Sequence, residues 1–373
     1  MSRPHPNSHL IGDLQARSAL ATPALILDLP VLEANLSTGM RLVKDAGKAF
    51  RPHFKAHKSL DIARRQLELG ATGICVATLS EAEAACELGA ELLLTSIIST
   101  DAQCKRIAAL AASGATIIAV VDHPDVALRL ESVLQGTCGA LDVLIDLDMR
   151  RARSGCATPK AAAELGNLVS ASPTLRLRGV QAYAGQLSHM TSCKERSAAH
   201  AEFTSRLAAF KFALSHILPD DPIVSGGSTG SMNLDLSGPL TELQCGSYAL
   251  MDVEYLNVEP GWTAWPFKPA LRVQSSVLST HWDAHAITDA GDKWFADKYG
   301  AAPRIVLGAP ETAVFEPISD EHARLVTEAK LHPGDRIECL PPHCDPTINL
   351  FAAYHVFAGE QLRDIWPIEA RGL

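Results

Sequence analysis

A short basic stretch near the start of the chain brings together several side chains that can exchange protons or act as nucleophiles. The stretch RPHFKAHKS, residues 51–59, contains one arginine, two histidines and two lysines. A solvated turn would also explain such a cluster, so the stretch alone does not indicate a site. It lies at the expected end of a strand, and its function therefore depends on which other groups the fold brings to that end.

A second stretch, SGGSTGS at residues 225–231, has the composition of an anion-binding turn. Glycines allow backbone N–H groups to converge, and serine and threonine hydroxyls add further donors, so such a turn can hold a phosphate. It lacks the lysine of a P-loop and does not indicate a triphosphate. A tight turn without a ligand is the alternative. The turn follows the seventh expected strand, and barrel enzymes often bind phosphate near their last two strands.

A third stretch, PPHCDPTINLF, contains a histidine and an aspartate two positions apart. On an extended strand, His343 and Asp345 would point to one side and Cys344 to the other. Imidazole and carboxylate on one face are typical ligands of a divalent metal, although a surface pair without a metal is the alternative. Cys344 is out of phase with this pair, and we assign it to packing.

The elements that would position these groups alternate regularly between residues 49 and 248. Most of the short apolar runs are followed by a segment with helical spacing, which predicts a parallel sheet buried on both faces. Eight such runs over about 200 residues indicate a closed (β/α)8 TIM-like barrel, with an open doubly wound sheet as the alternative. The runs are AFRPHFK, GICVATL, LLLTSII, TIIAVVD, DVLIDLD, GVQAYAG, IVSGGST and ELQCGSY, and helices are expected at residues 80–89, 102–113, 124–134, 159–170 and 193–218.

The composition of the chain changes after Tyr255. The following segments are rich in Trp, Val, Thr and Pro with little helical period, which predicts short strands joined by turns. We expect the barrel to span residues 22–255. Residues 1–21 and 256–373 would form a mostly β domain that carries the metal pair. An early strand, ALILDL, precedes a helix and would connect the two parts.

The overall composition excludes several classes of protein. The 373 residues are 47% hydrophobic and 20% charged, which is typical of a globular enzyme and excludes extensive disorder. With a net charge of −9 and no basic run, we expect no nucleic acid and no anionic membrane as a partner. We also expect no membrane span and no signal peptide. The nine cysteines show no framework spacing, so free thiols and a cytoplasmic location are expected.

In a barrel, chemistry lies where the strands end and the following loops begin. A lysine at the first strand end and a phosphate-binding turn after the seventh together indicate pyridoxal phosphate. Its aldehyde needs an amine, and its phosphate needs hydrogen-bond donors. The polar groups expected at the strand ends are His53, Lys55, His57, Lys58, Arg153, Tyr183, Gln186, His189, Gly246, Ser247, Tyr248 and Asp252.

As a set, the motifs resemble those of the fold-type III pyridoxal-phosphate enzymes, the alanine racemase-like group. Within it, they are most similar to the branch of D-threonine aldolase and D-serine dehydratase. The resemblance extends from residue 22 to residue 371, and it implies a (β/α)8 barrel followed by a mostly β C-terminal domain. The matching pieces are TPALILDLPVLEANL, RPHFKAHKS, RSG after an acidic strand, GVQAYAG, SGGSTGS, ELQCGSY, DAG and PPHCDPTINL.

The resemblance implies roles for the basic stretch and for the cofactor site. Lys55 would be the catalytic lysine that binds the cofactor. Its neighbours Arg51, His53 and His57 would help to lower its pKa and shape the pocket. Lys58 is assigned to a solvated helix start. The other cofactor-binding residues implied are Arg153, Tyr183, Ser228, Thr229, Gly230, Gly246 and Tyr248.

The resemblance also implies a general base and a metal pair. His189 would take a proton from the substrate, with metal-bound water as the alternative base. His343 and Asp345 would bind a divalent metal, and the hard oxygen of Asp345 favours Mn²⁺ or Mg²⁺, with Zn²⁺ as the alternative. Where aldolases of the branch often have a histidine after the tyrosine of QAY, this chain has Ala184. That departure leaves the size of the substrate open.

The implied activity is an aldolase dependent on pyridoxal phosphate and a divalent metal. It would cleave D-3-hydroxy-α-amino acids, of the D-threonine or 3-hydroxyaspartate type, to glycine and an aldehyde. A dehydratase acting on D-serine or D-3-hydroxyaspartate is the alternative, although that branch has a cysteine where this chain has Asp345. A racemase is a weaker alternative, because it would not use the metal pair. The pyridoxal-phosphate homeostasis protein is also a weaker alternative, because it lacks the β domain that this chain is expected to have. The resemblance further implies a homodimer.

Overall fold

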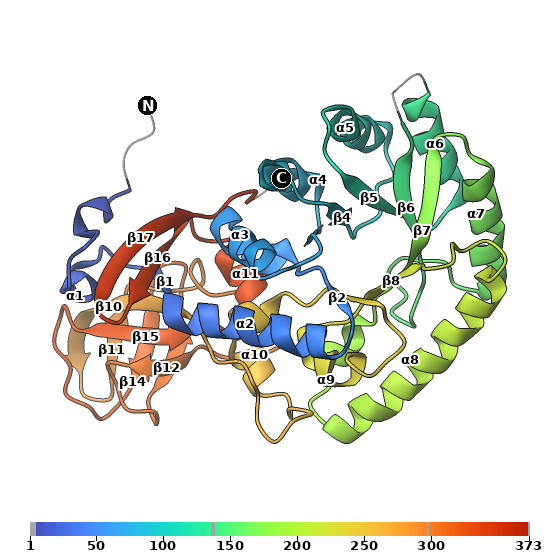
Figure 1. The fold of residues 1–373 in the computed structure, drawn as a ribbon. Coiled ribbons are helices and arrows are strands. Elements are labelled where there is room, and N and C mark those ends of the chain that lie inside the picture. The colour runs from blue at the N-terminus through green and yellow to red at the C-terminus, as the bar shows by residue number, and fades with distance from the viewer. Residues whose placement is uncertain (1–4, 136–138, 297, 372–373) are drawn as a thin grey trace.

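Eight short parallel strands curl into a barrel that forms one half of the molecule (Figure 1). The computed structural model describes residues 5–135, 139–296 and 298–371, and in this part of the chain the barrel strands pair in the order β2-β9-β8-β7-β6-β5-β4-β3. A parallel bridge between His53 and Cys75 joins the two ends of this path. The expected barrel is therefore confirmed, and each apolar run contributes one strand. The strands are β2 (Ala49–Phe50), β3 (Ile74–Val76), β4 (Leu92–Leu94), β5 (Ile117–Val121), β6 (Leu141–Asp146), β7 (Leu175–Ala182), β8 (Ile223–Gly226) and β9 (Glu242–Leu243).

The longer helices of the barrel each begin after a residue whose side chain accepts a hydrogen bond from the first turn. Thr100 and Gln103 form a capping box at the start of α5, and Thr158 accepts from the N–H of Ala161 in α7. The helices expected from the sequence are present, with ends that differ by a few residues. They are α2 (Leu29–Asp45), α3 (Leu60–Glu68), α4 (Leu79–Ala85), α5 (Asp101–Ala112), α6 (Pro124–Leu134), α7 (Pro159–Ala171) and α8 (Cys193–Leu214).

The other half of the molecule is a mixed sheet built from both ends of the chain (Figure 1). Strand β1, which precedes the barrel, pairs antiparallel with β10 and parallel with β16, so it belongs to this sheet by hydrogen bonding. The expected mostly β part is confirmed, whereas the expected domain boundaries stay a prediction. The strands are β1 (Ala24–Asp28), β10 (Leu271–Trp282), β11 (His285–Thr288), β12 (Arg304–Leu307), β13 (Val314–Pro317), β14 (Ala323–Val326), β15 (Arg336–Leu340), β16 (Ala353–Ala358) and β17 (Gln361–Pro367).

Short helical turns occupy many of the loops in both halves of the molecule. They are η1 (Ser8–Leu10), α1 (Ala16–Ala19), η2 (Phe54–Ala56), η3 (Cys86–Leu88), η4 (Gly185–His189), η5 (Thr229–Ser231), α9 (Met232–Asp235), η6 (Ser247–Ala249), α10 (Val253–Leu256) and α11 (Cys344–Ile348). The eight cysteines among the described residues are free thiols, in line with the absence of framework spacing. No helix in the described part of the chain is long and apolar enough to cross a membrane.

A bulge in β7 sets which of its side chains point into the barrel mouth. The register between β6 and β7 shifts next to Gly179, which has a φ of 151°. A Cβ atom at this position would lie 1.9 Å from the carbonyl oxygen of Ile223 in β8, so only glycine allows the two strands to approach this closely. Beyond the bulge, Gln181 and Tyr183 line the cavity described below.

Candidate active site

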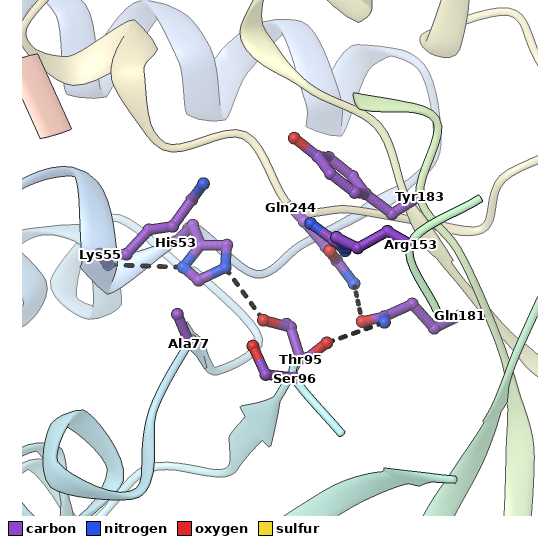
Figure 2. Close-up of a pocket in the computed structure, with 9 residues that line it drawn as sticks. All are labelled: His53, Lys55, Ala77, Thr95, Ser96, Arg153, Gln181, Tyr183 and Gln244. Carbon is purple, nitrogen blue, oxygen red and sulfur yellow. Dashed lines mark hydrogen bonds between the residues drawn. The ribbon is translucent and has the colours of Figure 1, made fainter. Parts of the chain in front are cut away.

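A cavity opens at the carboxyl ends of the barrel strands, where the chemistry of a barrel enzyme is expected. One part is lined by side chains close to the strand ends, and Figure 2 shows Thr95, Gln181 and Gln244 converging there. The adjoining part extends toward the C-terminal sheet and spans about 640 Å³, including space open to solvent. The expected site residues that line this second part are Lys55, Arg153, Tyr183, His189, Ser228, Thr229, Gly246, His343 and Asp345.

Lys55 lies in η2, directly beyond the first barrel strand. Its Nζ lies 3.4 Å from Oδ2 of Asp345, and 41% of its side chain is exposed, so the amine is accessible from the cavity. Burial disfavours the charged amine, but the Asp345 carboxylate outweighs burial and raises the pKa of Lys55 above its ordinary value. The expectation that neighbouring basic groups lower this pKa is therefore wrong, because a carboxylate lies closer.

Of the basic neighbours of Lys55, two lie inside the fold and one lines the cavity. His53 lines the cavity, and its Nε2 lies 3.2 Å from the hydroxyl of Thr95. Arg51 instead forms ion pairs inside the barrel with Glu91 at 2.8 Å and Glu242 at 2.9 Å. His57 is fully buried, and burial lowers its pKa to about 4. Of these three neighbours, His53 alone shapes the cavity.

Lys58 is not the solvated helix start that the sequence suggested. Only 12% of its side chain is exposed, and its Nζ lies 2.6 Å from Oε1 of the buried Glu81. The same amine donates to the carbonyl oxygen of Ala370 at 3.3 Å. The carboxylate of Glu81 would lose this partner if Lys58 were removed, so Lys58 holds neighbouring segments together and does not face the cavity.

The turn after β8 has the properties required of a phosphate cradle. Gly227, Ser228 and Thr229 line the cavity, and Gly246 and Ser247 from the loop after β9 face them. Within the described residues, the N–H groups of Thr229, Gly246 and Ser247 have no protein acceptor, whereas most buried N–H groups have one. These donors fit an anionic group.

Two of the expected phosphate-binding residues support the cradle without lining it. Gly230 lets η5 pack on η4, because a Cβ atom there would lie 2.2 Å from the carbonyl oxygen of Ser188. The ring of Tyr248 packs between Phe50 and Phe267 in the core, but its backbone N–H donates to Oγ1 of Thr229 at 2.9 Å. Tyr248 therefore fixes the turn through its backbone.

Arg153 and Tyr183 form one wall of the cavity. The guanidinium carbon of Arg153 lies 5.4 Å from the centre of the Tyr183 ring, a distance typical of a cation–π contact. Gly185 allows the ring to lie against the backbone, since a Cβ atom there would be 2.6 Å from a ring carbon. Figure 2 shows both side chains on the side of the cavity opposite Lys55. A flat aromatic cofactor would fit beside this wall.

His343 and Asp345 line the cavity from a local structure that differs from the expected one. Residues Cys344–Ile348 form the helix α11 with His343 as the N-cap residue, so the extended strand expected here is wrong. Pro346 lies in the first turn of this helix, where its missing N–H costs no hydrogen bond. His343 itself keeps an extended backbone, with φ of −142° and ψ of 131°.

The carboxylate of Asp252 determines which nitrogen of His343 is available. Oδ2 of Asp252 lies 2.9 Å from Nδ1 of His343 and accepts from the N–H of Cys344 at 2.8 Å. Because Nδ1 is engaged, Nε2 is the nitrogen left for a ligand. Burial lowers the pKa of His343, but the carboxylates of Asp252 and Asp345 outweigh burial and raise it overall.

A second combination of ligands shares the same histidine. Potential ligand atoms of Asp252, His343 and Cys344 lie within 4.8 Å of one another. His343 and Asp345 line the cavity, whereas Asp252 and Cys344 are not among its lining residues. Of the two combinations, the pair of His343 and Asp345 is the one in which both residues line the cavity.

His189 ends the turn η4 at the barrel mouth. Its ring stacks on Tyr299 at 3.8 Å and lies 6.2 Å from the ring of His343. Nδ1 lies 3.1 Å from Oε1 of Glu254, which leaves Nε2 for a substrate. Burial, followed by the positive charge of His343, lowers the pKa of His189 to about 4, so the imidazole is neutral near pH 7.

Several residues of the cavity have no motif that could have identified them from sequence. Nε2 of Gln244 donates to Oε1 of Gln181 at 3.3 Å, and the one available signal was a polar residue inside an otherwise apolar run. Lys298 and Tyr299 come from the loop between β11 and β12, where no spacing indicated a site. Asp252 was recognised only as a polar group near a strand end.

Comparison with known proteins shows which family this chain is similar to. The family model described as "Alanine racemase, N-terminal domain" matches residues 27–253, and a model of the serine dehydratase domain matches residues 270–357. A 3-hydroxy-D-aspartate aldolase of Paracoccus denitrificans (strain Pd 1222) is 34% identical over 95% of this chain and 93% of that protein. A D-threonine aldolase of Arthrobacter sp is 32% identical over 97% of this chain and 95% of its own length.

The solved structures give the same result for the fold. The crystal structure of D-threonine aldolase from Filomicrobium marinum has a TM-score of 0.90 and 33% identity, and the match covers 95% of this chain and 96% of that one. The resemblance inferred from the sequence is thereby confirmed. The chain belongs to the alanine racemase-like family of fold-type III pyridoxal-phosphate enzymes.

Proposed function

We propose that this chain is an aldolase dependent on pyridoxal phosphate and a divalent metal, which cleaves D-3-hydroxy-α-amino acids to glycine and an aldehyde. The observation that carries the proposal is that Lys55, His189, His343 and Asp345 all line one cavity. An amine, a neutral imidazole and a ligand pair in one place are the groups that such a cleavage needs.

The residues of the cavity fit the cofactor. Lys55 would bind its aldehyde, and Ser228, Thr229 and Gly246 would hold its phosphate through the donors of the cradle. Tyr183 and Arg153 would lie along its ring. When bound, pyridoxal phosphate supplies an electron sink for the carbon–carbon bond that breaks.

Two histidines would act on the hydroxyl of the substrate. His343 through Nε2 and Asp345 would hold the metal, which supplies a Lewis acid that makes the hydroxyl proton easier to remove. His189, whose Nδ1 is held by Glu254, would take that proton at Nε2. The carboxylate of Asp345 favours Mn²⁺ or Mg²⁺, whereas the imidazole of His343 also suits Zn²⁺, which is the competing ion. We also propose a cytoplasmic homodimer, with a barrel domain of residues 22–255.

Product analysis tests the function directly. Purified enzyme with pyridoxal phosphate and Mn²⁺ is expected to convert D-threonine to glycine and acetaldehyde, or D-3-hydroxyaspartate to glycine and glyoxylate. Chromatography of the amino acid and an aldehyde assay would measure the products. An oxo acid with ammonia, formed from either compound or from D-serine, would identify a dehydratase and contradict the proposal.

Replacing Lys55 tests the cofactor site independently of turnover. Lys55→Ala is expected to lose the visible absorbance of the lysine-bound cofactor, because the cavity then lacks its accessible amine. Lys58→Arg is the matched control, since arginine keeps a charge beside Glu81. If the Lys58 variant loses the absorbance and the Lys55 variant keeps it, the wrong lysine has been assigned.

Replacing Asp345 tests the metal site. Asp345→Ala is expected to weaken Mn²⁺ binding, measured by titration calorimetry, by at least about 100-fold, since even residues behind a ligand typically contribute 10–100-fold. Cys344→Ser should bind the metal as the parent does. If Cys344→Ser weakens Mn²⁺ binding and Asp345→Ala does not, the metal site consists of Asp252, His343 and Cys344 instead. Absorbance of the bound cofactor should be retained in both variants.

Replacing His189 tests the general base. His189→Asn keeps a polar side chain but cannot accept a proton near pH 7, so kcat is expected to fall by about 10²–10⁴. Cofactor absorbance and Mn²⁺ affinity should stay as in the parent. A kcat within about threefold of the parent, with an unchanged pH profile, would assign the proton to another group.

A further inference from the structure

Two cations at the mouth of the cavity have no ionic partner within the described residues. Arg151 lies in the loop after β6, and Lys298 lies in the loop between β11 and β12. Both side chains are exposed and line the part of the cavity that contains His189. Their near neighbours in sequence are paired outside the cavity: Arg150 with Glu202 at 2.7 Å, and Lys293 with Glu321.

The charges of the cavity leave these two cations without a role in the chemistry already described. Lys55 is paired with Asp345, the one carboxylate among the lining residues. Arg153 lies over the Tyr183 ring. The phosphate of the cofactor would be held by the donors of the cradle, and an α-carboxylate that took one of the two remaining cations would still leave the other without an anion.

Both cations line the part of the cavity that contains the proposed general base His189. The Nζ of Lys298 lies 5.3 Å from the centre of the Tyr299 ring, and His189 stacks on that same ring. Arg151 lines the same part of the cavity as His189. The two cations are therefore close to the proposed general base as well as to the solvent.

We propose that Arg151 and Lys298 bind a second carboxylate, which the substrate carries on its hydroxyl-bearing carbon. This inference rests on the proposed aldolase activity and narrows its substrates to 3-hydroxy dicarboxylic amino acids of the D-3-hydroxyaspartate type. A carboxylate there forms charge-assisted hydrogen bonds with both cations. The methyl group of D-threonine can form none of these bonds, so D-threonine is the poorer substrate.

Paired substrates test the assignment. In the parent holoenzyme with Mn²⁺, kcat/KM is expected to be about 10- to 100-fold higher for D-3-hydroxyaspartate than for D-threonine. Arg151→Met and Lys298→Met should each lower kcat/KM for the dicarboxylate about tenfold, and the value for D-threonine should change less than about threefold. Arg150→Met and Lys293→Met are matched controls, because those cations lie outside the cavity.

Binding of uncleavable analogues provides a readout that does not depend on turnover. D-Aspartate and D-2-aminobutyrate both lack the hydroxyl. D-Aspartate carries a carboxylate on its β-carbon, where D-2-aminobutyrate carries a methyl group. Titration of the cofactor absorbance should give tighter binding of D-aspartate in the parent, and this preference should disappear in the Arg151 and Lys298 variants. Equal losses for both analogues, weaker pyridoxal-phosphate binding, or no loss at all would overturn the assignment.

The outcome also separates this inference from the function on which it rests. A parent enzyme that cleaves D-threonine and D-3-hydroxyaspartate equally well is an aldolase without a site for the second carboxylate, and the inference then fails alone. A parent enzyme that releases no glycine from either compound contradicts the aldolase itself.

Discussion

The buried carboxylate of Asp252 connects the barrel to the segment that completes the cavity. Its Oδ2 lies 2.9 Å from Nδ1 of His343 and accepts from the N–H of Cys344, and its Oδ1 accepts from the N–H of Tyr255. The backbone of Val253 extends this contact by donating to the carbonyl oxygen of Pro341. A residue just beyond the last barrel strand thereby fixes the start of α11. Without it, neither His343 nor Asp345 would have a defined position opposite Lys55.

This contact is under a strong physical constraint. A carboxylate with no exposure to water is costly unless hydrogen bonds satisfy it, and Asp252 has donors at both oxygens. Removing a donor to this buried carboxylate leaves an oxygen unsatisfied, which typically costs about 1–3 kcal/mol or more. The arrangement therefore serves the fold and the site together. It holds the domain contact in place and leaves Nε2 of His343 for the cavity.

The sequence predicted the barrel well because buried parallel strands are continuous apolar runs, and each such run became a strand. Residue types and the resemblance to a family also pointed to Lys55, the glycine-rich turn and the proposed metal pair, and members of all three line one cavity. Side-chain directions were harder to predict. His343 and Asp345 alternate by two, but Pro346 fits a first helical turn, and a helix formed instead of a strand. The sequence alone places Lys58 at the surface, because the sequence does not show that its partner Glu81 is buried. Contacts between segments that are far apart in the sequence produce no local pattern, so the sequence does not predict them.

The same reasoning explains why the cavity needs both halves of the molecule. The barrel contributes the amine of Lys55 and the donors of the phosphate cradle, whose positions follow from strand ends. The C-terminal part contributes the carboxylate that faces this amine, through Asp345. It also contributes Tyr299, on which His189 of the barrel stacks. The proposed proton acceptor thus belongs to the barrel by sequence, is held there by Glu254, and stacks on a ring of the other half. In the proposed function, residues at the barrel strand ends would hold the cofactor, and selection of a hydroxyl-bearing substrate would depend on loops of the second sheet.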